Sequence, residues 1–138
     1  MDWKLELIVL PVSDVDRAKE FYSEKVGFTV DVDFHPNESF RVVQLTPPGS
    51  ACSITIGVGV THVVPGTYQG LHLVVDDIEA ARSELVARGV DVSEPFHFGP
   101  DGQTPGLHPE RADYGTYVSF PDPDGNGWLV QEVRHHAR

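Results

Sequence analysis

The sequence predicts an α+β fold built from two similar modules, each with the element order βαβββ. The first observation is an internal repeat, because the segment Val12–Tyr22 recurs at Val75–Leu85 with an apolar strand, a Ser/Asp cap and an amphipathic helix in both copies. The second is composition, since 13 glycines and 11 prolines favour many short strands and turns over a helical bundle. The third is size, because 138 residues suit one compact domain.

The repeat divides this single domain, residues 1–138, into two modules. Module 1 is predicted over about residues 4–60 and module 2 over about residues 68–134, joined by a linker that Pro65 and Gly66 mark. Half-size units bury too little surface to be stable alone. The modules are therefore expected to share a core or a cleft.

In module 1, the apolar run Leu5–Val12 predicts a buried strand. Ser13 is the predicted N-cap of a helix, with Asp16 in the capping-box position, and Gly27 is expected to end that helix. Three further strands complete the module, over Phe28–Phe34, Phe40–Leu45 and Cys52–Val58.

Module 2 repeats the pattern, beginning with a strand at Leu71–Val75. Asp76 and Glu79 predict a second capping box, and Gly89 should close the helix. The segment Gly99–Gly115 reads as a long irregular loop, which is either a functional lid or an exposed connection. The remaining elements are strands at Val90–Phe98, Tyr117–Phe120 and Trp128–Val133, a tight turn at Asp122–Asn126, and a polar surface tail with His135 and His136.

Composition narrows the possible partners. A net charge of −11 argues against nucleic acid, whose binding needs Lys and Arg at the phosphates, and favours a cationic ligand only weakly. One cysteine, Cys52, excludes an intrachain disulfide. Because no signal sequence or bilayer-spanning run is present, we expect a cytoplasmic protein without a membrane partner.

Two βαβββ modules, an Asp-capped helix after each first strand, and Asp122-Pro123-Asp124-Gly125-Asn126 before the last strand together resemble the vicinal oxygen chelate superfamily. Its members include glyoxalase I, extradiol dioxygenases and bleomycin-resistance proteins. The resemblance implies that each module forms half of a cup-shaped mixed sheet with its helices outside. It also implies a small organic ligand in the cup and a homodimer, with the cup formed either by the two modules of one chain or across the dimer.

The resemblance also implies where enzymes of this superfamily hold a divalent metal. The four corresponding positions are Leu7, Ser53, Gly70 and Leu129. None carries a usual ligand side chain, so no metal site and no cofactor are predicted. A one-residue slip of strand register would bring Glu6 and Glu132 into the cup, which leaves a divalent-metal enzyme as an alternative.

Strand alternation extends the set of side chains expected in the cup. His72 is the candidate catalytic base, or else a core histidine hydrogen-bonded to Gln131, Thr55 or the backbone. Arg111 and Tyr114 are candidates to close over a ligand from the long loop. The predicted ligand-binding residues are Leu7, Val9, Ser53, Thr55, Gly70, His72, Val74, Leu129, Gln131, Arg111 and Tyr114.

Three functions follow from this set of residues. The leading hypothesis is a protein that binds a partly apolar metabolite or drug in the cup between the modules, without a metal and without turnover. A metal-independent lyase or isomerase that uses His72 is the second. A divalent-metal glyoxalase or dioxygenase is the third.

Overall fold

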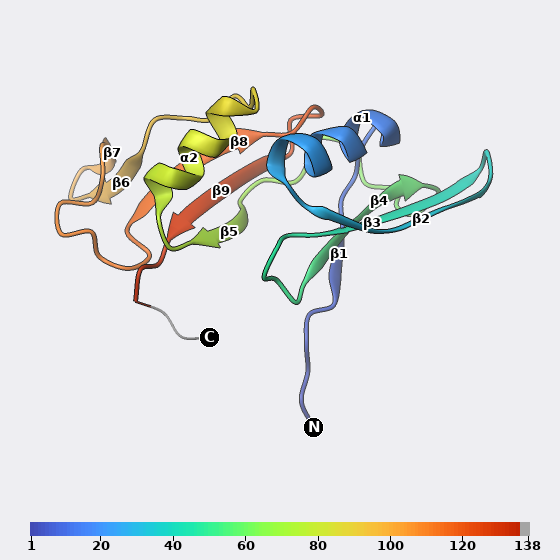
Figure 1. The fold of residues 1–138 in the computed structure, drawn as a ribbon, viewed down its shortest axis with the longest axis horizontal. Coiled ribbons are helices and arrows are strands. Elements are labelled where there is room, and N and C mark those ends of the chain that lie inside the picture. Colours follow the sequence, from blue (N-terminus) through green and yellow to red (C-terminus); the bar gives the residue numbers. More distant parts are fainter. Residues whose placement is uncertain (136–138) are drawn as a thin grey trace. The chain divides into compact units, whose positions relative to one another are not determined.

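The structure is a computed structural model that describes residues 1–135. The chain forms two compact units. Unit 1 contains Met1–Tyr68 and the short segment Asp122–Asn126; unit 2 contains Gln69–Pro121 and the chain from Gly127 onward (Figure 1). His135, in the predicted surface tail, is exposed, whereas His136 lies outside the described residues. No helix within residues 1–135 is long and apolar enough to cross a membrane.

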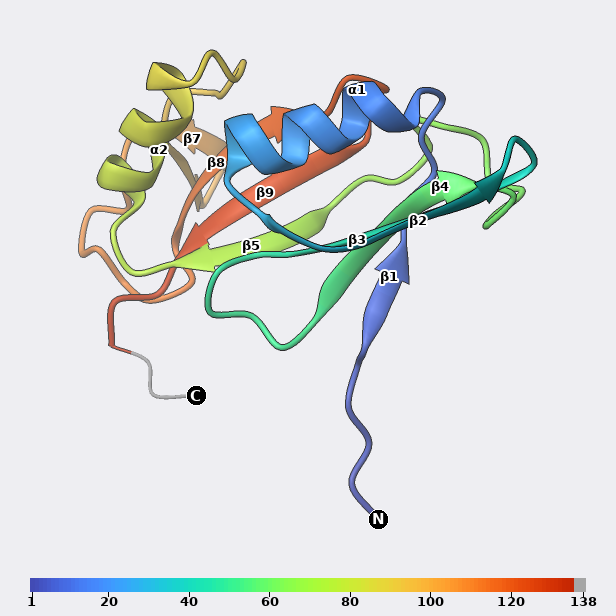
Figure 2. The same ribbon diagram turned by 45° about the vertical axis from the view of Figure 1, so that its right-hand side comes forward.

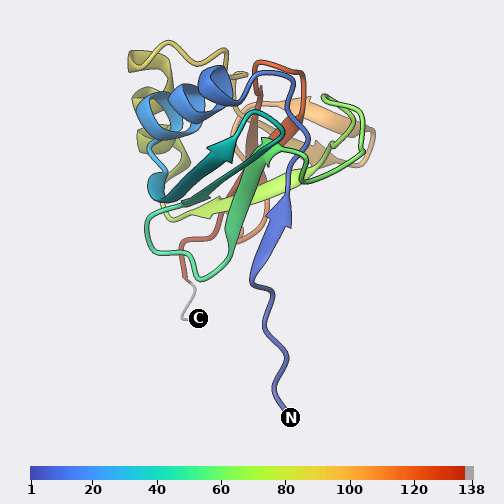
Figure 3. The same ribbon diagram turned by 90° about the vertical axis from the view of Figure 1, so that its right-hand side faces the viewer.

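Unit 1 has a four-stranded sheet in the order β1-β4-β3-β2, in which β1 runs parallel to β4 and the other pairs are antiparallel. One helical segment, α1, continues directly into a π-helical stretch, and Figure 3 shows it lying over the sheet of this unit. The elements are β1 (Leu7–Val9), α1 (Val15–Glu20), the π-helical stretch (Phe21–Val26), β2 (Thr29–Asn37), β3 (Phe40–Thr46) and β4 (Ser53–Val58).

Unit 2 has a five-stranded sheet in the order β5-β9-β8-β6-β7, in which only β5 and β9 are parallel. The helix α2 lies beside β8 and β9 (Figure 2). The elements are β5 (Leu71–Val75), α2 (Ile78–Ala87), β6 (Phe96–Gly99), β7 (Gly102–Pro105), β8 (Thr116–Pro121) and β9 (Gly127–Glu132).

Both predicted helix caps were wrong by one residue. The N-cap of α1 is Asp14, whose side chain accepts from the backbone N–H of Arg17, and the N-cap of α2 is Asp77, which accepts from that of Ala80. Ser13 is used elsewhere, because its N–H and its hydroxyl donate to the carboxylate of Asp124. Gly27 closes the first helical segment in the left-handed region, at φ 92°, as expected from a residue without Cβ.

The predicted strand Val90–Phe98 and the irregular segment Gly99–Gly115 also need correction. Only Phe96–Gly99 is strand, because the chain before it bonds to β8 through Ser93 rather than through a regular ladder. Within the expected loop, β7 pairs with β6 in a hairpin. Gly102, at φ 101°, permits the tight turn between them, and the polar Gly/Pro-rich sequence of β7 lacks the alternation that predicts a strand.

Each sheet packs one face against its own helix. In unit 1 the buried strand residues on that face are Val43, Leu45, Ile54 and Ile56, and the helical segment supplies Val15, Ala18 and Tyr22. In unit 2 the corresponding residues are Val118, Phe120, Trp128 and Val130, with Ile78 and Leu85 from α2. The opposite face of each sheet is therefore not covered by its own helix.

Candidate functional site

We define the helix-free face of each sheet as the face opposite its own helix. Two contacts identify the helix side. The guanidinium of Arg41 on β3 bonds the carboxylate of Asp16 on α1 at 2.7 Å, and the carboxylate of Glu132 on β9 accepts from the N–H of Ile78, the first residue of α2, at 3.0 Å. Since side chains alternate along a strand, the neighbours of Arg41 and Glu132 point to the helix-free faces.

In unit 1, four predicted residues share the helix-free face. Strand pairing sets Leu7 opposite Ser53 and Val9 opposite Thr55. Gln44 on β3 also lies opposite Thr55, although the sequence did not single it out. The alternation of Phe40–Leu45 was the signal that could have found Gln44, because it places Val43 and Leu45 in the core.

The polar side chains of this face form a line of hydrogen bonds. The Gln44 amide nitrogen contacts the hydroxyl of Ser53 at 3.3 Å, and that hydroxyl lies 2.6 Å from the hydroxyl of Thr46. The Thr46 hydroxyl in turn donates to Asp31. Thr55 stands beside this line but is not part of it, because its buried hydroxyl has no partner among the described residues.

In unit 2, His72, Val74, Leu129 and Gln131 share the helix-free face. The parallel pairing of β5 with β9 sets His72 opposite Leu129 and Val74 opposite Gln131. Gly70 lies just before β5 at φ 76°, and a Cβ added there would meet no atom within 4 Å. The structure therefore brings four of the predicted side chains together and places Gly70 at their edge.

His72 is exposed and is not a core histidine. Its Nδ1 lies 2.6 Å from the carbonyl oxygen of Gly70. Because a carbonyl only accepts, Nδ1 carries the hydrogen, and Nε2 of the neutral ring is an acceptor. Gln131 bonds elsewhere, since its amide nitrogen donates to the Tyr117 hydroxyl at 2.9 Å and to the Tyr114 carbonyl at 3.2 Å.

An aromatic group, which we define as Phe96, Phe98 and Tyr117, adjoins these residues on the same face. Tyr117 lies opposite both Gln131 and Phe96. The Phe96 and Tyr117 rings stack at 5.7 Å, and the Phe98 ring meets the Tyr117 ring edge-on at 5.5 Å. Phe98 keeps 57% of its surface exposed. The sequence did not single out this group, because the pairing of β6 with β8 that sets Phe96 opposite Tyr117 leaves no local pattern.

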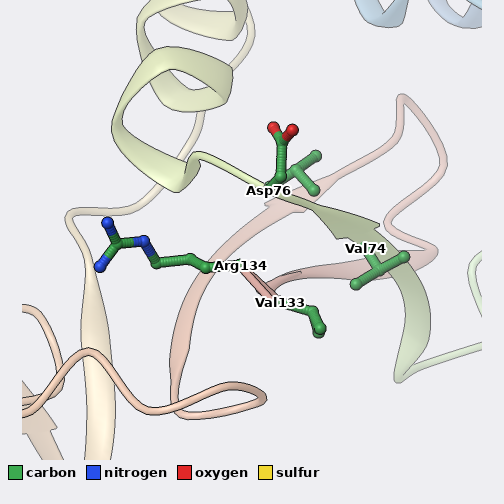
Figure 4. A pocket seen from close by; sticks show the side chains of 5 residues that line it. Val74, Asp76, Val133 and Arg134 are labelled. Atoms are coloured by element: carbon green, nitrogen blue, oxygen red, sulfur yellow. The ribbon is translucent and has the colours of Figure 1, made fainter. Parts of the chain in front are cut away.

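A pocket of about 420 Å³ opens where the parallel strands β5 and β9 end (Figure 4). In Figure 4, Arg134 extends away from the side chains of Val74 and Val133. Val74 belongs both to this pocket and to the helix-free face. The lining residues are Val74, Val75, Asp76, Val133 and Arg134, which combine three valines with one acid and one base.

The two predicted loop residues have different surroundings. Arg111 donates to the fully buried carboxylate of Glu132 through Nε at 2.9 Å and Nη2 at 2.6 Å. These bonds hold the pKa of Glu132 below its usual range. Tyr114 is anchored by its backbone N–H to the Glu132 carbonyl, while its side chain is 45% exposed. Tyr114 is thus the loop residue whose ring is accessible.

The residues present do not fit a divalent metal held in the manner of the enzymes that the sequence resembles. Leu7, Ser53, Gly70 and Leu129 supply neither imidazole nor carboxylate. Glu132 lies on the helix side, bonded to Arg111 and to Ile78, and Glu6 precedes β1. Among residues 1–135, no three His, Cys, Asp or Glu side chains are grouped so that they could hold a metal ion.

Comparison with known proteins agrees with this fold. The model of the Glyoxalase/Bleomycin resistance protein/Dioxygenase superfamily matches residues 4–130. The crystal structure of TnmS3, an antibiotic binding protein from Streptomyces sp. CB03234, is 32% identical, with a TM-score of 0.74, and the alignment covers 96% of this chain and 97% of that one.

Two further relatives extend the comparison. A glyoxalase/bleomycin resistance protein from the same strain is 33% identical, with a TM-score of 0.71 and coverage of 94% of this chain and 100% of that one. The uncharacterized protein YetH of Bacillus subtilis (strain 168) is 25% identical over 128 residues, which are 91% of this chain and 94% of YetH. The predicted α+β fold is confirmed.

Proposed function

This chain belongs to the glyoxalase/bleomycin resistance protein/dioxygenase superfamily, and from that premise we propose that it binds a small, partly apolar organic molecule of the antibiotic type without a metal. The homodimer and the cytoplasmic location stay predictions. The inter-module cup, which the sequence predicts as the place of this ligand, also stays a prediction.

The observation that carries the proposal is the aromatic group on the helix-free face of unit 2. Phe98 is 57% exposed, and its ring lies beside Tyr117, which bonds to Gln131. Half-buried Leu129 and exposed Val74 extend the apolar surface. Small-molecule sites combine such apolar and aromatic area with a few polar groups that orient the ligand. The similarity to an antibiotic binding protein supports the same function.

A metal-independent lyase or isomerase is the second candidate, and the orientation of His72 favours it. The bond from Nδ1 to the Gly70 carbonyl fixes the ring and leaves Nε2 as a base on the helix-free face. A proton taken from a ligand carbon would go to Nε2, and the electron pair of the broken C–H bond would form a new double bond within the ligand. The imidazolium would return the proton to another carbon of the same molecule in an isomerase, or to the departing group in a lyase.

The test is calorimetric titration of the native protein with bleomycin and with antibiotics that carry fused aromatic rings, followed by mass spectrometry of the recovered compounds. We expect binding of one molecule per site with the compound unchanged. His72→Ala should retain binding, and His35→Ala, at an exposed position on β2, is the matched control. Chemical conversion that His72→Ala abolishes would instead establish the enzyme, and absence of any binding would refute the proposed function.

A further inference from the structure

The buried hydroxyl of Thr55 is the unusual polar group of unit 1. Thr55 is 6% exposed, and its Oγ1 has no hydrogen-bond partner among the described residues. Leaving a buried hydroxyl unbonded destabilises a folded protein, so nearly all such groups are satisfied. The Thr55 hydroxyl would therefore be stabilised by a hydrogen-bond partner that the described residues do not supply.

The surroundings of Thr55 show where such a partner would lie. Ile54 and Ile56 face the helix side, so the side chain of Thr55 points to the helix-free face, between Val9 on β1 and Gln44 on β3. The amide nitrogen of Gln44 is directed to Ser53 instead. Neighbouring polar side chains thus bond to each other, while the Thr55 hydroxyl has no partner among the described residues.

The chemistry of this position disfavours an anionic partner. A hydroxyl can donate one hydrogen bond and accept others, so it suits a carbonyl or a hydroxyl group. Thr55 lies opposite Val9 and Gln44, which carry no positive charge, and the line of hydrogen bonds beside it ends at the Asp31 carboxylate. A net charge of −11 further disfavours an anionic group.

We propose that the Thr55 hydroxyl is a specificity-determining group that hydrogen-bonds a neutral carbonyl or hydroxyl oxygen of the bound molecule. This inference rests on the proposed function. It adds a requirement for ligand chemistry: an uncharged oxygen placed against the helix-free face of unit 1.

The first part of the test measures stability without ligand. Thr55→Val keeps the shape and removes the unbonded hydroxyl, so the midpoint of thermal unfolding should rise by about 2–5 °C. Thr116→Val is the matched control, because the fully buried Thr116 hydroxyl accepts from the His108 N–H at 3.0 Å. The control should lower the midpoint. A lowered midpoint for Thr55→Val as well would show that its hydroxyl is already satisfied and would overturn the inference.

The second part compares two probes by NMR titration, 2-acetylnaphthalene and 2-ethylnaphthalene, which differ by a carbonyl oxygen. Thr55→Val should bind the ketone about 3- to 10-fold more weakly than the native protein does, with the hydrocarbon unchanged, and Thr55→Ser should restore most of the difference. Equal loss for both probes, or none for the ketone, would overturn the inference while the proposed function stands. Failure of the native protein to bind either naphthalene would count against both.

Discussion

The phenol hydroxyl of Tyr22 donates a 2.7 Å hydrogen bond to the buried carboxylate of Asp122, 100 residues later in the chain. The other oxygen of Asp122 accepts from the backbone N–H groups of Asp124 and Asn126. Asn126 in turn donates its amide to the carbonyl of Pro11 at 2.8 Å. The Asp122–Asn126 turn is thereby part of unit 1, although it follows nearly all of unit 2 in sequence.

Replacing Tyr22 by Phe should measure how much the hydrogen bond from Tyr22 to Asp122 contributes to the free energy of unfolding. The substitution removes one hydrogen bond to a buried carboxylate, so the free energy of unfolding should fall by about 1.5–3 kcal/mol, measured by urea denaturation. Tyr68→Phe, at a half-buried position of the same unit, should change it by less than about 0.5 kcal/mol. Equal effects of the two substitutions would contradict a specific role for the Tyr22 hydroxyl.

Arg111 should matter far more than an ordinary surface arginine. Arg111→Ala would leave the fully buried Glu132 carboxylate without its cation, and we expect a loss of about 3–5 kcal/mol in unfolding free energy. Arg82→Ala breaks a pair with the exposed Glu94 and should cost about 1 kcal/mol or less. A small effect at both positions in chemical denaturation would show that Glu132 is solvated when Arg111 is absent.

The same pair predicts a pH dependence. Arg111 lowers the pKa of Glu132 in the folded protein, so the stability that the charged carboxylate contributes is present above the ordinary pKa of 4.5 and is lost as the pH falls further. The difference in unfolding free energy between the native protein and Glu132→Gln should therefore narrow from pH 7 to pH 3. Urea denaturation at several pH values would measure it, and a constant difference would refute the assignment.

Gly57 should tolerate no side chain. A Cβ at Gly57 would lie 1.9 Å from the backbone carbonyl oxygen of Arg41, which the sheet holds in place, so Gly57→Ala should cost about 3 kcal/mol or more. Gly127 provides the control, because a Cβ there would meet the side-chain oxygen of Gln69 at 2.1 Å, and a flexible side chain can move. Thermal unfolding should separate the two variants clearly; similar midpoints would refute the clash at Gly57.

Phe98 should contribute to binding rather than to stability. Phe98→Ala removes an exposed ring next to Tyr117 and should weaken binding of 2-acetylnaphthalene by about 2- to 12-fold. Its unfolding midpoint should stay within a few degrees of the native value. Trp3→Ala, at an exposed position before β1, is the control. Unchanged affinity of Phe98→Ala would remove the aromatic group from the proposed site.

Divalent metals should neither stabilise the protein nor be needed for binding. Leu7, Ser53, Gly70 and Leu129 offer no ligand side chains, so Zn, Ni, Fe or Mn should shift the thermal midpoint by less than about 1 °C. Elemental analysis of protein purified without chelators or a nickel column is the direct check. Near-stoichiometric metal with clear stabilisation would overturn the metal-free proposal.

The sequence alone determined the fold class and the side of each sheet that faces its helix. Period-two alternation placed His72 with Val74, and Leu129 with Gln131, because successive side chains of a strand must point to opposite faces. The repeat predicted that a strand and a helix open each half, β1 with α1 and β5 with α2, although it missed β7. These features depend on local backbone geometry. That geometry is set by residues that are neighbours in the sequence.

Only the tertiary structure decided which polar groups find partners. Ser13 has a side chain suited to a helix cap, but its hydroxyl donates to Asp124 instead. Arg111 was a candidate to contact a ligand, but its guanidinium is bonded to Glu132. The lack of a partner for the Thr55 hydroxyl, and the contact of Phe98 with Tyr117, likewise depend on strands distant in sequence. Such contacts form between residues that no local pattern connects, and their energies decide among local alternatives of nearly equal propensity.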